Sequence, residues 1–104
     1  MSLPEEYEDR LSRMDEFINE LCAQLQHAYQ DTQVSELRSR LAKNNAEAVA
    51  NYNLQQAKAE RFRTQPGCEA LYELRVNAAK KSLERQLAFS ETMLESFQQS
   101  LKKS

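Results

Sequence analysis

The sequence predicts an all-α fold, an elongated antiparallel three-helix bundle that forms one domain over residues 1–104, and three observations lead to it. Glycine and proline, the strongest helix breakers, number only one and two in the 104 residues. Two long segments repeat apolar residues at spacings of three and four, which is typical of helices packed along a seam. Charged residues make up 29% of the chain and hydrophobic residues 40%, a balance that suits a narrow core beneath a large polar surface.

The first helix is expected over residues 4–29. Pro4 suits the first turn of a helix, and the acidic residues that follow it complement the positive end of the helix dipole. The apolar seam alternates spacings of four and three, and flanking residues widen it enough to contact two neighbouring helices. The seam comprises Tyr7, Leu11, Met14, Ile18, Leu21, Leu25 and Ala28, and the flanking residues are Phe17, Cys22 and Tyr29.

A second helix is expected over residues 33–64, after a turn at Gln30–Gln33. Val34, Leu37 and Leu41 are two residues out of phase with the first seam. At about 100° per residue, this offset moves the apolar stripe to nearly the opposite face of a helix. Because no glycine marks the turn, the alternative is a long helical hairpin whose first helix runs over residues 4–64 and which dimerises to cover its seams.

The middle helix has the weakest apolar stripe of the three. Asn45 and Gln56 interrupt the stripe, and asparagine amides compete with a helix for backbone hydrogen bonds. We therefore expect this helix to be the one that meets a partner. Its stripe comprises Val34, Leu37, Leu41, Ala48, Val49, Tyr52, Ala59 and Phe62.

The third helix is expected over residues 68–102. Pro66 and Gly67 end the helix before it, because the residue that precedes a proline disfavours helical geometry. The turn then folds the third helix back along the second. The seam of the third helix comprises Leu71, Leu74, Val76, Ala78, Ala79, Leu83, Leu87, Ser90, Leu94, Phe97 and Leu101, with Phe89 and Met93 beside it.

The residue inventory argues against an enzyme. His27 is the only histidine, and Cys22 and Cys68 are the only cysteines, fewer than the four ligands of a structural zinc site. One glycine cannot form a phosphate-binding loop, and adjacent carboxylates diverge around a helix. The two cysteines would lie about 27 Å apart along the bundle, too far for a disulfide. We expect no catalytic site, no metal, no cofactor and no small-molecule substrate.

The formal net charge is −2 at pH 7, which argues against nucleic acid or an anionic membrane as a partner, since phosphate binding depends on clustered lysine and arginine. Residues 1–30 hold seven acids and two bases (−5), residues 31–67 four acids and six bases (+2), and residues 68–104 five acids and six bases (+1). No apolar run approaches the about 20 residues of a membrane-spanning helix, and the acidic start of the chain is unlike a signal peptide. We expect a cytoplasmic location.

By exclusion, the sequence predicts a non-enzymatic protein–protein interaction module. It would act as an adaptor, a small helical chaperone or an assembly subunit that binds another protein, or a second copy of itself in a homodimer, through helix faces. The alternative is a membrane-surface or nucleic-acid-associated helical scaffold that acts by self-assembly. The predicted contact residues are Tyr52, Leu54 and Phe62 as anchors and Arg61 and Arg63 as rim charges.

Overall fold

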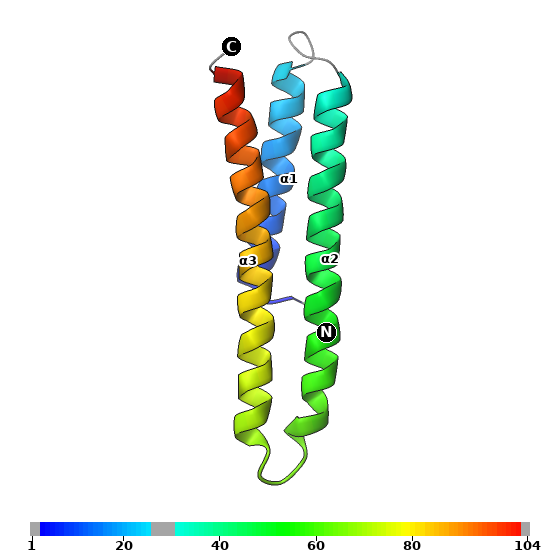
Figure 1. The fold of residues 1–104 in the computed structure, drawn as a ribbon, viewed down its shortest axis with the longest axis vertical. Helices are drawn as coiled ribbons and strands as arrows, with labels where there is room; N and C mark the ends of the chain where they lie inside the picture. The colour runs from blue at the N-terminus through cyan, green and yellow to red at the C-terminus, as the bar shows by residue number, and fades with distance from the viewer. Residues whose placement is uncertain (1–2, 26–30, 103–104) are drawn as a thin grey trace.

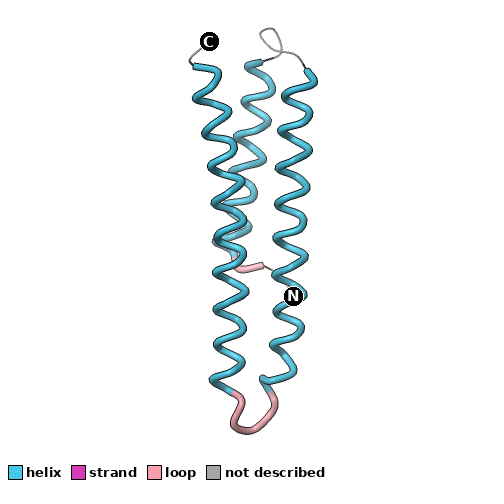
Figure 2. Tube along the Cα trace, in the orientation of Figure 1, coloured by secondary structure: helices cyan, strands magenta, loops and turns pink. Residues whose placement is uncertain are grey.

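The computed structural model, which describes residues 3–25 and 31–102, contains three long helices. They are α1 (Glu5–Leu25), α2 (Asp31–Arg63) and α3 (Glu69–Lys102). Each helix runs antiparallel to the one before it, and together they form a rod of 61 × 21 × 19 Å (Figures 1 and 2). The predicted elongated three-helix bundle is therefore confirmed.

The structure corrects the predicted connection between the first two helices. Because α1 and α2 lie side by side in opposite directions (Figure 1), the alternative with one uninterrupted helix over residues 4–64 is wrong. Asp31 already belongs to α2, so the helix begins two residues earlier than expected. The predicted end of the first helix at Tyr29 lies outside the described residues, as does Gln30 of the predicted turn.

Two local signals position the helix ends as the sequence predicted. At the start of α1, the carbonyl oxygen of Pro4 accepts hydrogen bonds from the backbone N–H groups of Tyr7 and Glu8, at 3.0 and 3.2 Å. Between α2 and α3, Gly67 adopts a φ of +81°, a backbone conformation that residues with a Cβ disfavour. The only glycine of the chain therefore stands at the turn that reverses its direction.

The core runs along the axis of the bundle and draws on all three helices. Leu83 and Leu87 are completely buried, and Tyr52 is 5% exposed. Most of the predicted seam positions with described side chains lie in this core. The core cluster comprises Tyr7, Met14, Ile18 and Leu21 of α1, Leu37, Leu41, Ala48 and Tyr52 of α2, and Ala79, Leu83, Leu87 and Leu94 of α3.

The helices differ in length, and this difference leaves part of the α2–α3 hairpin uncovered. At about 1.5 Å per residue, the 21 residues of α1 span about 31 Å. The 33 residues of α2 and the 34 of α3 span about 50 Å each. Figure 1 shows that α1 packs against the half of the hairpin remote from the Pro66–Gly67 turn.

We call residues 53–82 the distal hairpin, because they extend beyond the level at which Tyr7 of α1 contacts Tyr52 and Glu84. Leu71 and Leu74 belong to it, and they are 38% and 66% exposed. Ala78 is also exposed. Their predicted place in the seam of the third helix is therefore wrong, since at about 100° per residue all three lie roughly 120–180° around α3 from the fully buried Leu83 and so face away from the core.

Candidate interaction surface

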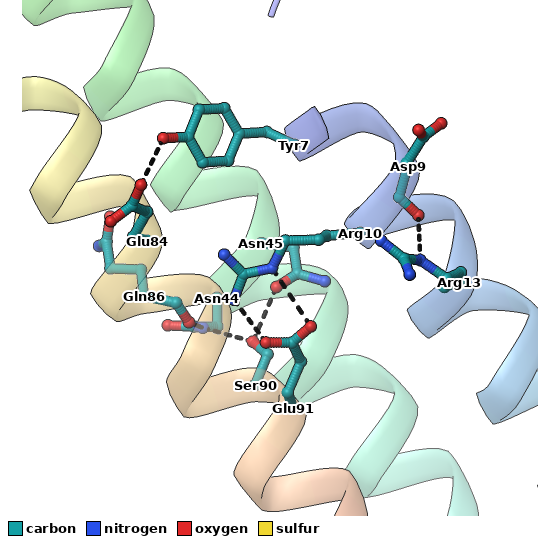
Figure 3. Close-up of polar contacts among 10 residues, drawn as sticks. All are labelled: Tyr7, Asp9, Arg10, Arg13, Asn44, Asn45, Glu84, Gln86, Ser90 and Glu91. Atoms are coloured by element: carbon teal, nitrogen blue, oxygen red, sulfur yellow. Dashed lines mark hydrogen bonds and ion pairs between the residues drawn. The ribbon is translucent and has the colours of Figure 1, made fainter. Parts of the chain in front are cut away.

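Two polar contacts fix α1 on α3 in the covered half of the bundle (Figure 3). The Tyr7 hydroxyl donates a hydrogen bond of 2.8 Å to Oε1 of Glu84. The guanidinium of Arg10 donates to both carboxylate oxygens of Glu91, over 3.3 and 2.5 Å. The hydrogen bond to Glu91 raises the pKa of Arg10, so the contact favours the charged guanidinium.

Tyr7 makes the attachment of α1 sensitive to alkali. Burial, followed by the hydrogen bond to Glu84, raises the pKa of the Tyr7 hydroxyl. In the unfolded chain a tyrosine ionises near pH ~10. Above that pH the unfolded state releases the proton while the folded state keeps it, so stability that is present at lower pH is lost as the pH rises. We expect a loss of about 1 kcal/mol per pH unit above pH ~10.

Urea unfolding at about pH 9 and about pH 11, on the wild type and on Tyr7→Phe, measures this loss. Tyr7→Phe keeps the buried ring and removes the ionisable group, so it is expected to lose less stability between the two pH values. Equal losses in the two proteins would show that Tyr7 does not carry the effect.

A buried polar layer joins α2 to α3 at the centre of the covered half (Figure 3). Ser90 is completely buried. Nδ2 of Asn44 donates to Oγ of Ser90 over 2.6 Å and to the carbonyl of Gln86 over 3.0 Å. The Ser90 hydroxyl donates in turn to Oδ1 of Asn45 over 2.7 Å. Buried polar groups cost stability unless they are hydrogen-bonded, so this layer has a structural role. Asn45 lies at the edge of the core, and its side-chain oxygen has a hydrogen-bond partner there.

The structure places the five predicted contact residues in different environments. The prediction that Tyr52 contacts a partner is wrong. Its ring lies in the core, 6.4 Å from the ring of Tyr7, and its hydroxyl accepts a hydrogen bond from Gln56. Leu54 is 53% exposed. Arg61 and Arg63 are exposed and Phe62 is half-buried. Four of the five residues therefore lie at or near the surface of the distal hairpin.

A shallow groove of about 190 Å³ connects α2 and α3 on the side of the hairpin that faces away from α1. Its lining residues are Asn51 and Gln55 of α2, and Arg75, Ala78, Ala79 and Ser82 of α3. The side that faces α1 is marked on α3 by Glu84 and Glu91. Ser82 is two residues from Glu84, hence about 200° around the helix. The groove therefore opens on the opposite side of the hairpin from α1.

Regular spacing extends this side of the hairpin toward the turn. On α3, Leu71 precedes the groove residue Arg75 by four positions, which puts both on one face of the helix. On α2, Lys58 and Phe62 follow Gln55 by three and seven positions and share its face in the same way. Leu54 and Arg61 lie beside Lys58 at spacings of four and three. We call these residues the far face: Leu54, Lys58, Arg61, Phe62, Leu71 and Arg75.

Arg63 does not belong to the far face. Its guanidinium pairs with Glu60 three residues earlier, at 3.4 Å. Arg75 was not predicted as a site residue, yet it stacks on a predicted one, with its guanidinium carbon 5.2 Å from the centroid of the Phe62 ring. The spacing of Leu71, Arg75, Ala78 and Ser82 at four, three and four positions could have revealed this stripe. That this stripe lies next to α2 depends on how α2 and α3 pair, which the spacing alone does not give.

The described residues hold no group of histidine, cysteine, aspartate or glutamate side chains that could bind a metal ion. Within the same part of the chain, none of the helices is both long and apolar enough to span a membrane. The thiol of Cys68 lies 3.6 Å from Oε1 of Gln65 at the start of α3. The side chains of Cys22, His27 and Tyr29 lie outside the described residues.

Comparisons with protein-family models, with curated proteins and with solved structures find no match to this chain. The fold defines the structural class of the protein, which is an all-α three-helix bundle with one short helix and a long hairpin. Function is therefore inferred from the surface of the distal hairpin.

Proposed function

We propose that this chain is a non-enzymatic interaction module that binds another protein through its distal hairpin. One observation carries the proposal. Of the four large hydrophobic side chains exposed among the described residues, three lie in this segment: Leu54, Leu71 and Leu74, at 53%, 38% and 66% exposure. Single exposed apolar residues are ordinary, whereas several on one segment of the surface favour a contact surface.

The covered half of the bundle indicates how such a partner would bind. There, α1 packs against the paired helices α2 and α3 and contributes apolar side chains to the shared core. On its far face, opposite the side against which α1 packs, the distal hairpin offers the same two helices without a third. A partner helix laid along the hairpin would bury Leu54 and Leu71, which is a common mode of peptide recognition. An adaptor, a small helical chaperone and an assembly subunit all use this kind of contact.

Photo-crosslinking tests the proposal at chosen positions. Benzoylphenylalanine would replace Leu54 or Leu71 on the distal hairpin and, as a matched control, Ser12, which is exposed on α1. After illumination in the protein's own cell extract, we expect one discrete adduct from positions 54 and 71 and none from position 12.

Circular dichroism would first show that the three labelled proteins have the same helix content. An adduct pattern that is identical at all three positions would contradict the proposal, because the contact would then not be confined to the distal hairpin. The absence of an adduct at positions 54 and 71 would also contradict it.

A further inference from the structure

We infer that the far face recognises a carboxylate side chain on an acidic amphipathic helix of the partner, and that Arg75 is the residue that determines this specificity. The inference rests on the proposed function and adds the chemistry of the partner. It is drawn from the charge of the far face, the position of Arg75 and the shape of the groove beside it.

The charge of the far face is positive. Lys58, Arg61 and Arg75 lie on it, whereas each acidic residue of the distal hairpin stands two positions from a member of the same face. Glu60 is two residues from Lys58, Glu69 two from Leu71, and Glu73 two from Arg75. Two residues correspond to about 200° around a helix, so these carboxylates point away from Lys58, Leu71 and Arg75.

Arg75 is held in a position suited to bind a carboxylate. Its guanidinium carbon lies over the Phe62 ring, 5.2 Å from the centroid, and such a cation–π contact favours this position of the side chain while its N–H groups can still donate hydrogen bonds. The ion pairs found within residues 3–25 and 31–102 join Arg10 to Glu91 and Arg63 to Glu60, so Arg75 has no acidic partner in this part of the chain. An arginine in this state can bind a carboxylate through two parallel hydrogen bonds.

The groove that Arg75 lines can receive side chains of a helix laid across it. Ala78, Ala79 and Ser82 form one wall, and small side chains let the backbone of a neighbouring helix come close. Asn51 and Gln55 form the other wall and supply further hydrogen-bond donors. Leu54 and Leu71 provide apolar contacts nearby. The occupant that fits is a helix with apolar residues on one face and a glutamate or aspartate beside them.

A two-fold dimer of this chain does not fit this surface. A two-fold dimer places the same patch on both sides of the contact. It would bring Lys58, Arg61 and Arg75 of one copy against the same three cations of the other, and opposed like charges destabilise an interface. The complementary occupant is a separate acidic segment.

The test uses designed peptides as probes and two-dimensional NMR of the ¹⁵N-labelled protein as the readout. One peptide carries leucines along one face of a helix with glutamates beside them, and a second has glutamine at each glutamate. We expect the acidic peptide to shift the amide signals of the groove and far face and to bind about tenfold more tightly than the glutamine peptide.

Variants assign the effect to Arg75. Arg75→Gln is expected to reduce the affinity for the acidic peptide about tenfold and to leave the glutamine peptide unchanged. Arg75→Lys keeps the charge but loses the bidentate contact. Its affinity for the acidic peptide should therefore lie between that of the wild type and that of Arg75→Gln. Arg85→Gln is the matched control, since Arg85 is exposed on the same helix and does not line the groove; it should change neither affinity.

The outcomes separate this inference from the proposed function. Equal binding of both peptides at the far face would overturn the carboxylate inference and leave an apolar docking surface in place. Binding of neither peptide, or signal shifts confined to α1, would overturn the inference, and the crosslinking from positions 54 and 71 would then decide the proposed function. Equally tight binding to vesicles of an anionic phospholipid would also overturn the carboxylate inference, because the far face would then bind negative charge in general and would not be specific for a protein helix.

Discussion

Tyr52→Ala is expected to lower the free energy of unfolding by about 3 kcal/mol, as truncation of a large buried aromatic residue does. The ring of Tyr52 is 5% exposed and lies beside Tyr7, and its hydroxyl accepts a hydrogen bond of 2.9 Å from the buried Gln56. The substitution removes the packed ring and leaves the Gln56 amide without this acceptor. In a domain of this size, a loss of about 3 kcal/mol lowers the melting temperature by more than about 10 °C.

Leu54→Ala is the matched control for Tyr52→Ala, because it lies two residues away on the same helix and is 53% exposed. Its melting temperature should stay close to that of the wild type, since surface substitutions usually change stability by less than about 0.5 kcal/mol. Thermal unfolding followed by circular dichroism measures both variants. If Tyr52→Ala melted like the wild type, Tyr52 would be a surface residue and the core described above would be wrong.

Leu87→Ala is expected to cost about 3 kcal/mol, within the range found for buried leucines. Leu87 is completely buried in α3, on the part of the helix that packs against both α1 and α2. Removal of its side chain leaves a cavity that the neighbouring helices can fill only in part. Urea unfolding with a linear extrapolation to water would give the change.

Phe89→Ala is the control for Leu87→Ala, two residues further along α3, where the phenylalanine side chain is 60% exposed. We expect Phe89→Ala to change the free energy of unfolding only slightly, although phenylalanine is a larger residue than leucine. A greater loss in Phe89→Ala than in Leu87→Ala would mean that α3 is rotated about its axis relative to the arrangement described here.

The number and direction of the helices could be predicted from the sequence because the signals are local. Pro66 and Gly67 impose a reversal, and the phase shift between Leu25 and Val34 separates the first two helices. The exact end of each helix was harder to predict. Asp31 lies within α2, although the predicted turn extended to Gln33, because no glycine or proline marks the boundary.

What the sequence could not show is how far α1 reaches along the hairpin, since this depends on tertiary contacts. The spacing of Leu71 and Leu74 is compatible with a seam, but the packing around Leu83 turns another face of α3 inward and leaves both residues exposed. A second seam was readable at Tyr72, Val76 and Ala79, where the spacings of four and three lead to Leu83.

The polar residues of the middle helix were misjudged for a similar reason. Asn45 interrupts the apolar stripe in the sequence, but its hydrogen-bond partner Ser90 lies on another helix, 45 positions away. The candidate site was predicted in part. Leu54 and Phe62 could be chosen because the bulky residues of the chain cannot all face one seam, and Arg61 as a charge beside them. The role of Arg75 follows from the position of its guanidinium over the Phe62 ring across the hairpin.

The mass of the adduct formed through position 54 tests most directly the claim that the distal hairpin binds a separate protein. We expect an adduct that contains one 12.1 kDa chain joined to a different polypeptide, with the linkage mapped to an acidic helical segment of that partner. An adduct made of two copies of this chain would contradict the account, because the far face would then be an interface for self-assembly.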